Sequence, residues 1–273
     1  MRLVLATTLL SIALASDAKA VEIELRTYPA VDAKSSLYDK SAAEFTLGSN
    51  ISRVREILAS SYASFKIKDW SPGAQANISI QGQRVYTDIR PFLRTIHMSH
   101  SSPEQTEDWA LHLTSPTTNS RLYAVVRKVS YPPGAKIAPP DILESAVSRY
   151  GAPQVMTETE VSWFYKHNGA SNEGWEACRT MSGQIQSWLS APNKFLDTYE
   201  AALRYTNAKC GGVISLSVSK DGDGLASGFR FLAYDGTLDV SDRYNVFLSM
   251  KTDLENAAAE AEAGKARPPT PKF

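Results

Sequence analysis

The clearest pattern of apolar and polar positions lies between residues 209 and 235. Residues 213–219 alternate apolar or β-branched side chains with serines, which is the period of a strand with one buried face. The segment Asp221-Gly222-Asp223-Gly224 follows, and its residues tolerate the positive φ of a tight turn. Residues 229–234 then alternate again. This stretch predicts a β-hairpin around which the second half of the chain is organised.

The first half of the chain predicts a helix followed by strands. Apolar residues recur at helical spacing between residues 51 and 62, and either Ser49 or Asn50 can cap this helix. Short strands are expected at residues 78–80, 85–89 and 92–98. A hairpin is expected from residues 108–113 and 122–131, because both segments alternate and a polar, Pro-containing turn separates them.

The second half begins with the best-specified helix of the sequence. Asp141 is expected to cap it, with Glu144 three residues further on, and Gly151 is expected to end it. A strand at residues 158–167, a helix at 193–203 and a long final helix at 238–263 complete the expected elements.

Runs of strands with separate helices indicate an α+β fold. A proline-rich boundary divides an N-terminal module at residues 21–135 from a C-terminal module at 139–263. Each module is expected to be an antiparallel sheet with helices packed on one face. Both modules share the order helix, strands, hairpin, which leaves a duplication open. Residues 21–28 fit a strand or a linker, and the proline-containing residues 264–273 are expected to be a disordered tail.

Residues 1–20 have the pattern of a secretory signal peptide. Arg2 precedes a short apolar run, and Ala18-Lys19-Ala20 ends it with small residues, so cleavage is expected after Ala20. The alternative is an uncleaved anchor, but the apolar run is shorter than the roughly 20 residues that span a bilayer. We therefore expect a periplasmic or secreted protein with no membrane span.

Charge excludes one class of partner. The chain has a formal net charge of zero, and removal of residues 1–20 leaves −1. Such a balance provides no basic footprint for nucleic acid. The expected partner is therefore a protein or a small ligand.

The two cysteines, Cys178 and Cys210, predict one disulfide, because an exported chain passes into an oxidising compartment. The alternative is two free thiols.

Histidines and aromatic residues provide the remaining candidate sites. A zinc site of His97, His100 and Glu104 is conceivable, but its spacing matches no common motif and surface histidines are the preferred interpretation. His112 is expected on the polar face of its strand. Trp163 and Tyr165 flank Phe164 in a strand, so either a helix packs on the aromatic face or these rings bind a partner. No metal or cofactor is expected.

One resemblance to known domains is carried by Leu47-Gly48-Ser49, which opens a short helix that antiparallel strands follow, in an exported chain with one expected disulfide. This arrangement resembles BamE/SmpA-type periplasmic domains and the similar tandem domains of the beta-lactamase-inhibitor-protein type. The resemblance covers residues 46–131 and 139–235. It implies helices stacked on an antiparallel sheet and a function in binding other proteins. The lipid-bearing cysteine of BamE lipoproteins is missing, and no site residue is transferred.

These observations favour an exported, non-enzymatic protein of two α+β modules that binds a protein or a ligand. The alternative is an exported hydrolase or metal-dependent enzyme that uses His97, His100 and nearby acids.

Overall fold

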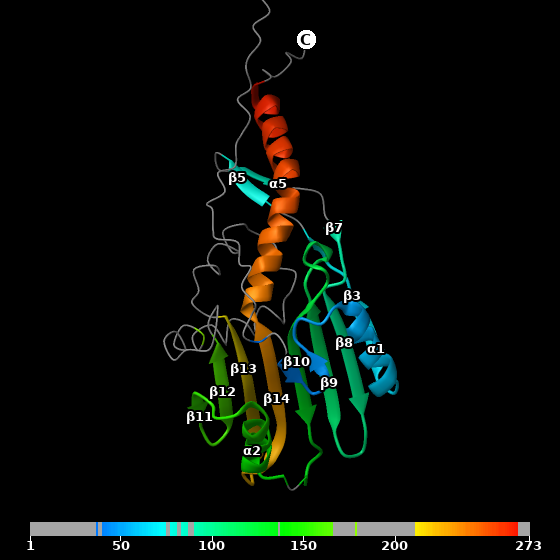
Figure 1. Cartoon of the computed structure of the whole chain (residues 1–273), viewed down its shortest axis with the longest axis vertical. Coiled ribbons are helices and arrows are strands. Elements are labelled where there is room, and N and C mark those ends of the chain that lie inside the picture. Colours follow the sequence, from blue (N-terminus) through cyan, green and yellow to red (C-terminus); the bar gives the residue numbers. More distant parts are fainter. Residues whose placement is uncertain are drawn as a thin grey trace, which may run out of the picture.

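The computed structural model describes residues 37, 40–74, 77–80, 83–86, 90–135, 137–165, 178 and 211–266. The fold is α+β, as expected: helices lie against an antiparallel sheet, and one long helix extends beyond the end of that sheet (Figure 1). The signal peptide, the strand or linker at 21–28, the helix at 193–203 and residues 267–273 of the expected tail lie outside the described residues and remain predictions. Residues 264–266, which were also expected in the disordered tail, are helical instead.

Eight strands form one antiparallel sheet, in the order β11-β12-β13-β14-β10-β9-β8-β3. In chain order, its strands are β3 (Lys66–Trp70), β8 (Thr95–Ser101), β9 (Thr106–Leu113), β10 (Leu122–Ser130), β11 (Val155–Met156), β12 (Glu160–Tyr165), β13 (Gly212–Lys220) and β14 (Ala226–Asp235). Two-stranded pairs are formed by β1 (Ser41–Ala42) with β2 (Phe45–Thr46), β4 (Gly73–Ala74) with β7 (Arg90–Pro91), and β5 (Asn77–Ile80) with β6 (Gln83–Tyr86). The two expected hairpins are confirmed as β9–β10 and β13–β14.

Each half of the chain contributes four neighbouring strands to the eight-stranded sheet. Strands β3, β8, β9 and β10 come from the first half, and β11 to β14 come from the second. The last strands of the two halves, β10 and β14, pair with each other from Ala124 opposite Tyr234 to Ser130 opposite Gly228. The expectation that each half has its own sheet is therefore corrected, because backbone hydrogen bonds between β10 and β14 join the halves.

Helix α1 (Ile51–Ser61) begins where the sequence predicts. Asn50 occupies the cap position, and its Oδ1 accepts a hydrogen bond from the backbone N–H of Arg53 at 2.9 Å. The side chain therefore satisfies one of the N–H groups that a helix leaves unpaired at its start.

Helix α2 (Pro139–Tyr150) begins earlier than expected. Ala138 occupies the cap position, and Asp141 lies in the first turn, so the expected cap at Asp141 is wrong. Proline is well suited to the first helical turn, because the N–H that it lacks has no partner there in any case. Gly151, at φ 84°, ends α2 as expected.

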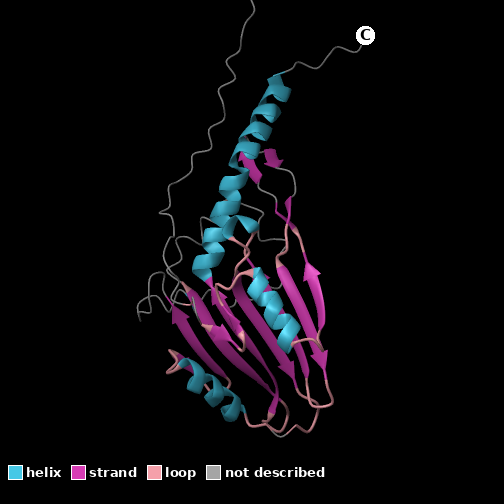
Figure 2. Ribbon diagram, turned by 45° about the vertical axis from the view of Figure 1, so that its right-hand side comes forward, coloured by secondary structure: helices cyan, strands magenta, loops and turns pink. Residues whose placement is uncertain are grey.

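The main hydrophobic core lies between one face of the sheet and α1, α2 and the β1–β2 hairpin (Figure 2). We call this side of the sheet the helical face. Helix α1 contributes Val54, Ile57 and Leu58 to this core, and α2 contributes Leu143 and Ala146. A smaller buried cluster on the opposite face includes Tyr123, Phe164 and Tyr234.

Helix α5 (Gly236–Ala266) follows β14 directly and has 31 residues, a length of about 46 Å. Its distal part extends beyond the sheet and lies beside the β5–β6 hairpin in both views (Figures 1 and 2). Its buried side chains recur every four residues, at Val246, Met250, Leu254 and Ala258. The expected long final helix is therefore confirmed.

Candidate functional site

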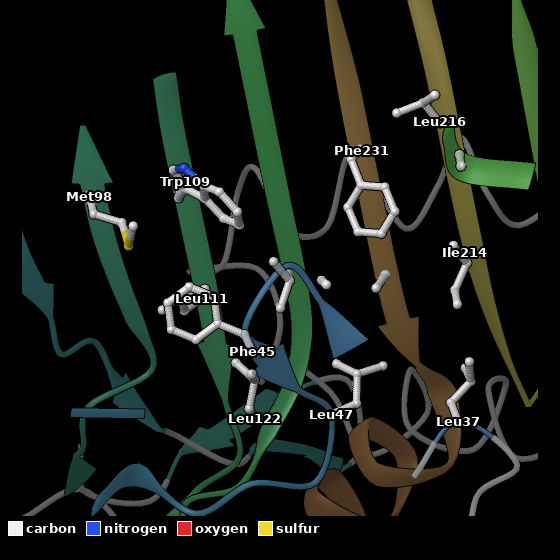
Figure 3. Close-up of a cluster of buried hydrophobic side chains, with 14 of the residues drawn as sticks. Leu37, Phe45, Leu47, Met98, Trp109, Leu111, Leu122, Ile214, Leu216 and Phe231 are labelled. Carbon is white, nitrogen blue, oxygen red and sulfur yellow. The ribbon is translucent and has the colours of Figure 1, made fainter. Parts of the chain in front are cut away.

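One row of side chains crosses the helical face of the sheet, and a single member of this row is charged. The strand registers place Met98, Trp109, Arg127, Phe231, Leu216 and Val161 opposite one another on successive strands. Side chains of such facing residues project on the same side of a sheet. Trp109 and Phe231 project from the strands on the two sides of β10, which carries Arg127 (Figure 3). Arg127 is thus a guanidinium at the centre of an otherwise apolar row.

Glu107 holds the Arg127 side chain in place. Nε and Nη2 of Arg127 both donate to Oε2 of Glu107, at 3.1 and 2.9 Å. The same carboxylate accepts a hydrogen bond from Trp109 Nε1 at 3.1 Å and another from Gln105 Nε2. The guanidinium carbon lies 4.8 Å from the Trp109 ring centre and 5.4 Å from that of Phe229, so aromatic rings contact it as well.

A groove of about 410 Å³ opens above this row. Its floor is formed by Trp109, Arg127, Leu216, Phe229 and Phe231. Helix α2 forms one wall, and the β1–β2 hairpin contributes a second wall. This volume lies within the range of cavities that hold small molecules, and the lining is mostly apolar with a few polar groups, as in typical ligand sites.

The α2 wall has a polar ridge at the rim of the groove. Asp141, Ser145 and Arg149 line the groove at intervals of four residues and therefore share one side of the helix. Ile142, Ala146 and Tyr150 lie one residue further along and carry the apolar part of the wall.

The C-terminal end of α2 is attached to the β1–β2 hairpin. Nη2 of Arg149 donates to Ser41 Oγ at 2.8 Å and to the carbonyl oxygen of Ala43 at 2.6 Å. The Tyr150 hydroxyl donates to the carbonyl oxygen of Ser41 at 2.7 Å, and its ring stacks on Phe231 at 5.9 Å. These contacts join the last turn of α2 to the β1–β2 hairpin and to the sheet.

The phenol groups beside the groove remain protonated at neutral pH. Burial raises the pKa of Tyr131 above its ordinary value, and burial likewise raises the pKa of Tyr150. Both hydroxyls are therefore neutral hydrogen-bonding groups and not bases.

The candidate aromatic site at Trp163 and Tyr165 is part of the core. Trp163 is 3% exposed, contacts the Tyr150 ring at 5.3 Å, and donates from Nε1 to the carbonyl oxygen of Gly151. Tyr165 packs against the same core, and burial raises its pKa to about 12. Of the two alternatives for this strand, the packing of a helix holds for Trp163, because Tyr150 of α2 packs against this ring.

The candidate histidines lie on opposite sides of β8. His97 lines a polar hollow of about 590 Å³ on the face opposite α1 and α2, and burial followed by the charge of Lys68 lowers its pKa. His100 stacks on Phe65 at 4.9 Å, in phase with the core residue Met98. Two histidines on opposite faces of one strand cannot ligate the same metal or act on the same substrate atom. Among the described residues, no group of three or more His, Cys, Asp or Glu side chains could hold a metal ion.

A cluster of buried ions lies where α5 meets the sheet. Arg94 is 2% exposed and donates to Asp242 at 2.7 Å and to Asp239 at 3.3 Å. Asp239 also accepts hydrogen bonds from Arg243 and from the Tyr234 hydroxyl. Two arginines and two aspartates therefore balance each other in this cluster.

His112 lies next to this cluster and not on the polar surface expected for it. It is 1% exposed, and its Nδ1 lies 3.1 Å from Thr95 Oγ1. Burial, followed by the charges of Arg94 and His97, lowers its pKa to about 3. An imidazole with this pKa is neutral at neutral pH.

Cys178 lies near the start of β13. Its Sγ is 3.6 Å from the carbonyl oxygen of Tyr165 and 3.7 Å from that of Gly212, two residues after Cys210. Cys210 lies outside the described residues, so the disulfide stays a prediction that this placement supports.

Comparison with known proteins found no relative: no family model matches the chain, and neither a curated sequence nor a solved structure matches it significantly. Among the described helices, none is both long and apolar enough to cross a membrane.

Proposed function

We propose that this protein is an exported, non-enzymatic binding protein that holds a small apolar ligand in the groove between α2 and the β1–β2 hairpin. The observation that carries this proposal is the row across the helical face. Arg127 interrupts this row at the floor of a 410 Å³ groove, where a packed core would place an apolar side chain. The aromatic floor would supply affinity, and the few polar groups would orient the ligand.

The lining favours binding over catalysis. The described residues that line the groove include no histidine, cysteine or lysine. Its phenols stay protonated, and its Asp141 and Ser145 lie on the exposed rim of α2. A nucleophile needs an adjacent base within hydrogen-bond reach, and the groove floor offers none among these residues.

Export is the second part of the proposal, and the sequence of residues 1–20 supports it. The mature chain would begin at Val21 in the periplasm or the medium. Intact-mass measurement of protein from these fractions tests this, and recovery of the full-length chain from the cytosol would overturn it.

The groove is tested with a neutral fluorescent probe, N-phenyl-1-naphthylamine, on the purified mature chain. We expect saturable binding with enhanced probe fluorescence. Ser145→Trp places an indole at the rim of the groove and should abolish the signal. Ser148→Trp is the matched control, because Ser148 is also exposed on α2 but does not line the groove. Absence of binding, or equal loss in the two variants, would refute the proposal.

A further inference from the structure

The groove also indicates what kind of ligand it holds. Resting on the proposed ligand groove, we infer that this ligand is an apolar molecule with one carboxylate, and that Arg127 on the floor and Arg149 on the α2 wall favour the carboxylate.

The guanidinium of Arg127 has more hydrogen-bond donors than Glu107 uses. Among the described residues, this guanidinium donates through Nε and Nη2, both to Glu107. Glu107 itself is almost buried and accepts from Trp109 and Gln105 as well. The Glu107 carboxylate therefore has its hydrogen bonds without Nη1 of Arg127. The two N–H groups of this Nη1 belong to a side chain that is 29% exposed at the groove floor.

A bound ligand would cover the floor of the groove and change the surroundings of Arg127. A ligand that fills the groove removes water from Arg127 Nη1. A purely apolar ligand would leave these donors of a charged group without acceptors, which is costly in a desolvated site. A ligand that places an oxygen acceptor there avoids this cost. The floor therefore selects against a pure hydrocarbon.

The positive charge of Arg149 favours a charged acceptor in the ligand over a neutral one. Arg149 lies beside Tyr150, whose ring stacks on Phe231, and Phe231 is the register partner of Arg127. The two arginines therefore line the same groove, Arg127 from its floor and Arg149 from its α2 wall. Among the described residues, the acceptors of Arg149 are the neutral oxygens of Ser41 and Ala43. Its positive charge thus favours an anion, and the pairing of guanidinium with carboxylate is stronger than with a neutral oxygen.

The end of the groove that lies away from Arg149 suits the apolar part of the ligand. Asp141 lies eight residues before Arg149 on α2, about 12 Å away along the helix. Ile137 and Ile142 line the groove, and Tyr131 contacts the ring of Phe229, which also lies 5.4 Å from the Arg127 guanidinium. The carboxylate of Asp141 repels an anion, so the ligand is oriented with its carboxylate toward Arg149.

The test compares decanoate with its methyl ester, decanol and decylamine, by calorimetric titration of the mature chain. Decanoate should bind at least about tenfold more tightly than the alcohol, and the amine should bind most weakly. If no member binds, the proposed groove itself fails. If all bind equally, the groove stands and the inference of a carboxylate is wrong.

Variants assign the selectivity to the arginines. Arg149→Gln should lower the affinity for decanoate several-fold and leave that for the ester unchanged, and Arg149→Lys should restore it. Arg53→Gln, at an exposed arginine of α1, is the matched control. The pair Glu107→Gln with Arg127→Met removes both charges of this ion pair together and should abolish the preference for the acid over the ester. Retention of that preference in the pair and in Arg149→Gln would overturn the inference.

Discussion

Replacing Arg94 by leucine should destabilise the protein more than any surface substitution. Arg94 and Asp242 are both almost fully buried, and the two side chains meet at 2.7 Å. Arg94→Leu leaves the Asp242 carboxylate buried without its cation, whereas Asp239 keeps Arg243. Removal of one partner from a buried ion pair costs about 3–5 kcal/mol. This is a large share of the 5–15 kcal/mol that stabilises a typical protein, and it should lower the melting temperature by about 6–20 °C.

Urea unfolding followed by circular dichroism measures this loss. Arg53→Leu on α1 is the control and should change the free energy of unfolding by less than about 0.5 kcal/mol, because the Arg53–Glu56 pair is exposed. Asp242→Asn combined with Arg94→Leu should recover much of the loss, since the neutral amide can still accept the N–H of Ser115. A loss below about 1 kcal/mol for the single variant, or no recovery in the double variant, would refute the reasoning.

Three further outcomes are expected. The pKa of His112 is lowered to about 3, so between pH 6.5 and 3 the unfolded chain binds a proton that the folded chain does not. The free energy of unfolding should therefore decrease as the pH is lowered from 6.5 to 3, by up to about 1.4 kcal/mol per pH unit. His112→Asn should flatten this slope in urea titrations, and an unchanged slope would contradict the assignment. Gly228→Ala places a methyl group against a backbone carbonyl of β10 and should lower the free energy of unfolding by about 1–3 kcal/mol. Gly222→Ala is the control, because a methyl group there meets open space, and equal urea midpoints for the two variants would contradict this prediction. Titration of the denatured, non-reduced protein should find no free thiol from Cys178 and Cys210, and reduction should cost about 3–4 kcal/mol; two thiols would disprove the pairing.

Local periodicity was sufficient to predict most of the described elements. In the hairpins β9–β10 and β13–β14, alternation in the sequence matches alternation in burial at residues 106–110 and 216–219. Residues 212–216 and 231–235 are buried on both faces, because a second cluster covers the opposite side of the sheet. Asn50 and Gly151 mark helix ends through chemistry that acts within a few residues. The expected cap at Asp141 is wrong because α2 already begins at Pro139, so that two prolines precede Asp141 in the first turn.

The joining of the two halves was not predictable from such patterns. The pairing of β10 with β14 connects residues about a hundred positions apart, and each strand would show the same alternation at the edge of a separate sheet. The burial of His112 has a similar cause. His112 is buried beside Arg94, whose partners Asp239 and Asp242 come from α5, far along the chain, and the strand of His112 gives no sign of them.

The candidate groove did leave a signal in the sequence. Glu107 and Arg127 occupy apolar positions in the alternation of their strands. Glu107 lies opposite Val129, and Arg127 lies opposite Trp109. A charged residue in the buried phase of an alternating strand is a reason to expect a buried pair or a binding site. Trp163 belongs to the hydrophobic core and Tyr165 packs against it, although the sequence left a binding surface open at these positions.

The position of the groove also connects binding to the assembly of the fold. Trp109 and Arg127 on its floor come from the first half of the chain, and Leu216, Phe229 and Phe231 come from the second. Neither half alone contains the site, because its floor crosses the β10–β14 pairing. A ligand that binds only the joined sheet must stabilise that sheet, by about 2.7 kcal/mol at a free concentration of one hundred times its Kd. Occupancy of the groove would therefore strengthen the contact between the two halves, and any substitution that weakens β10–β14 pairing, such as Gly228→Ala, should weaken ligand binding as well.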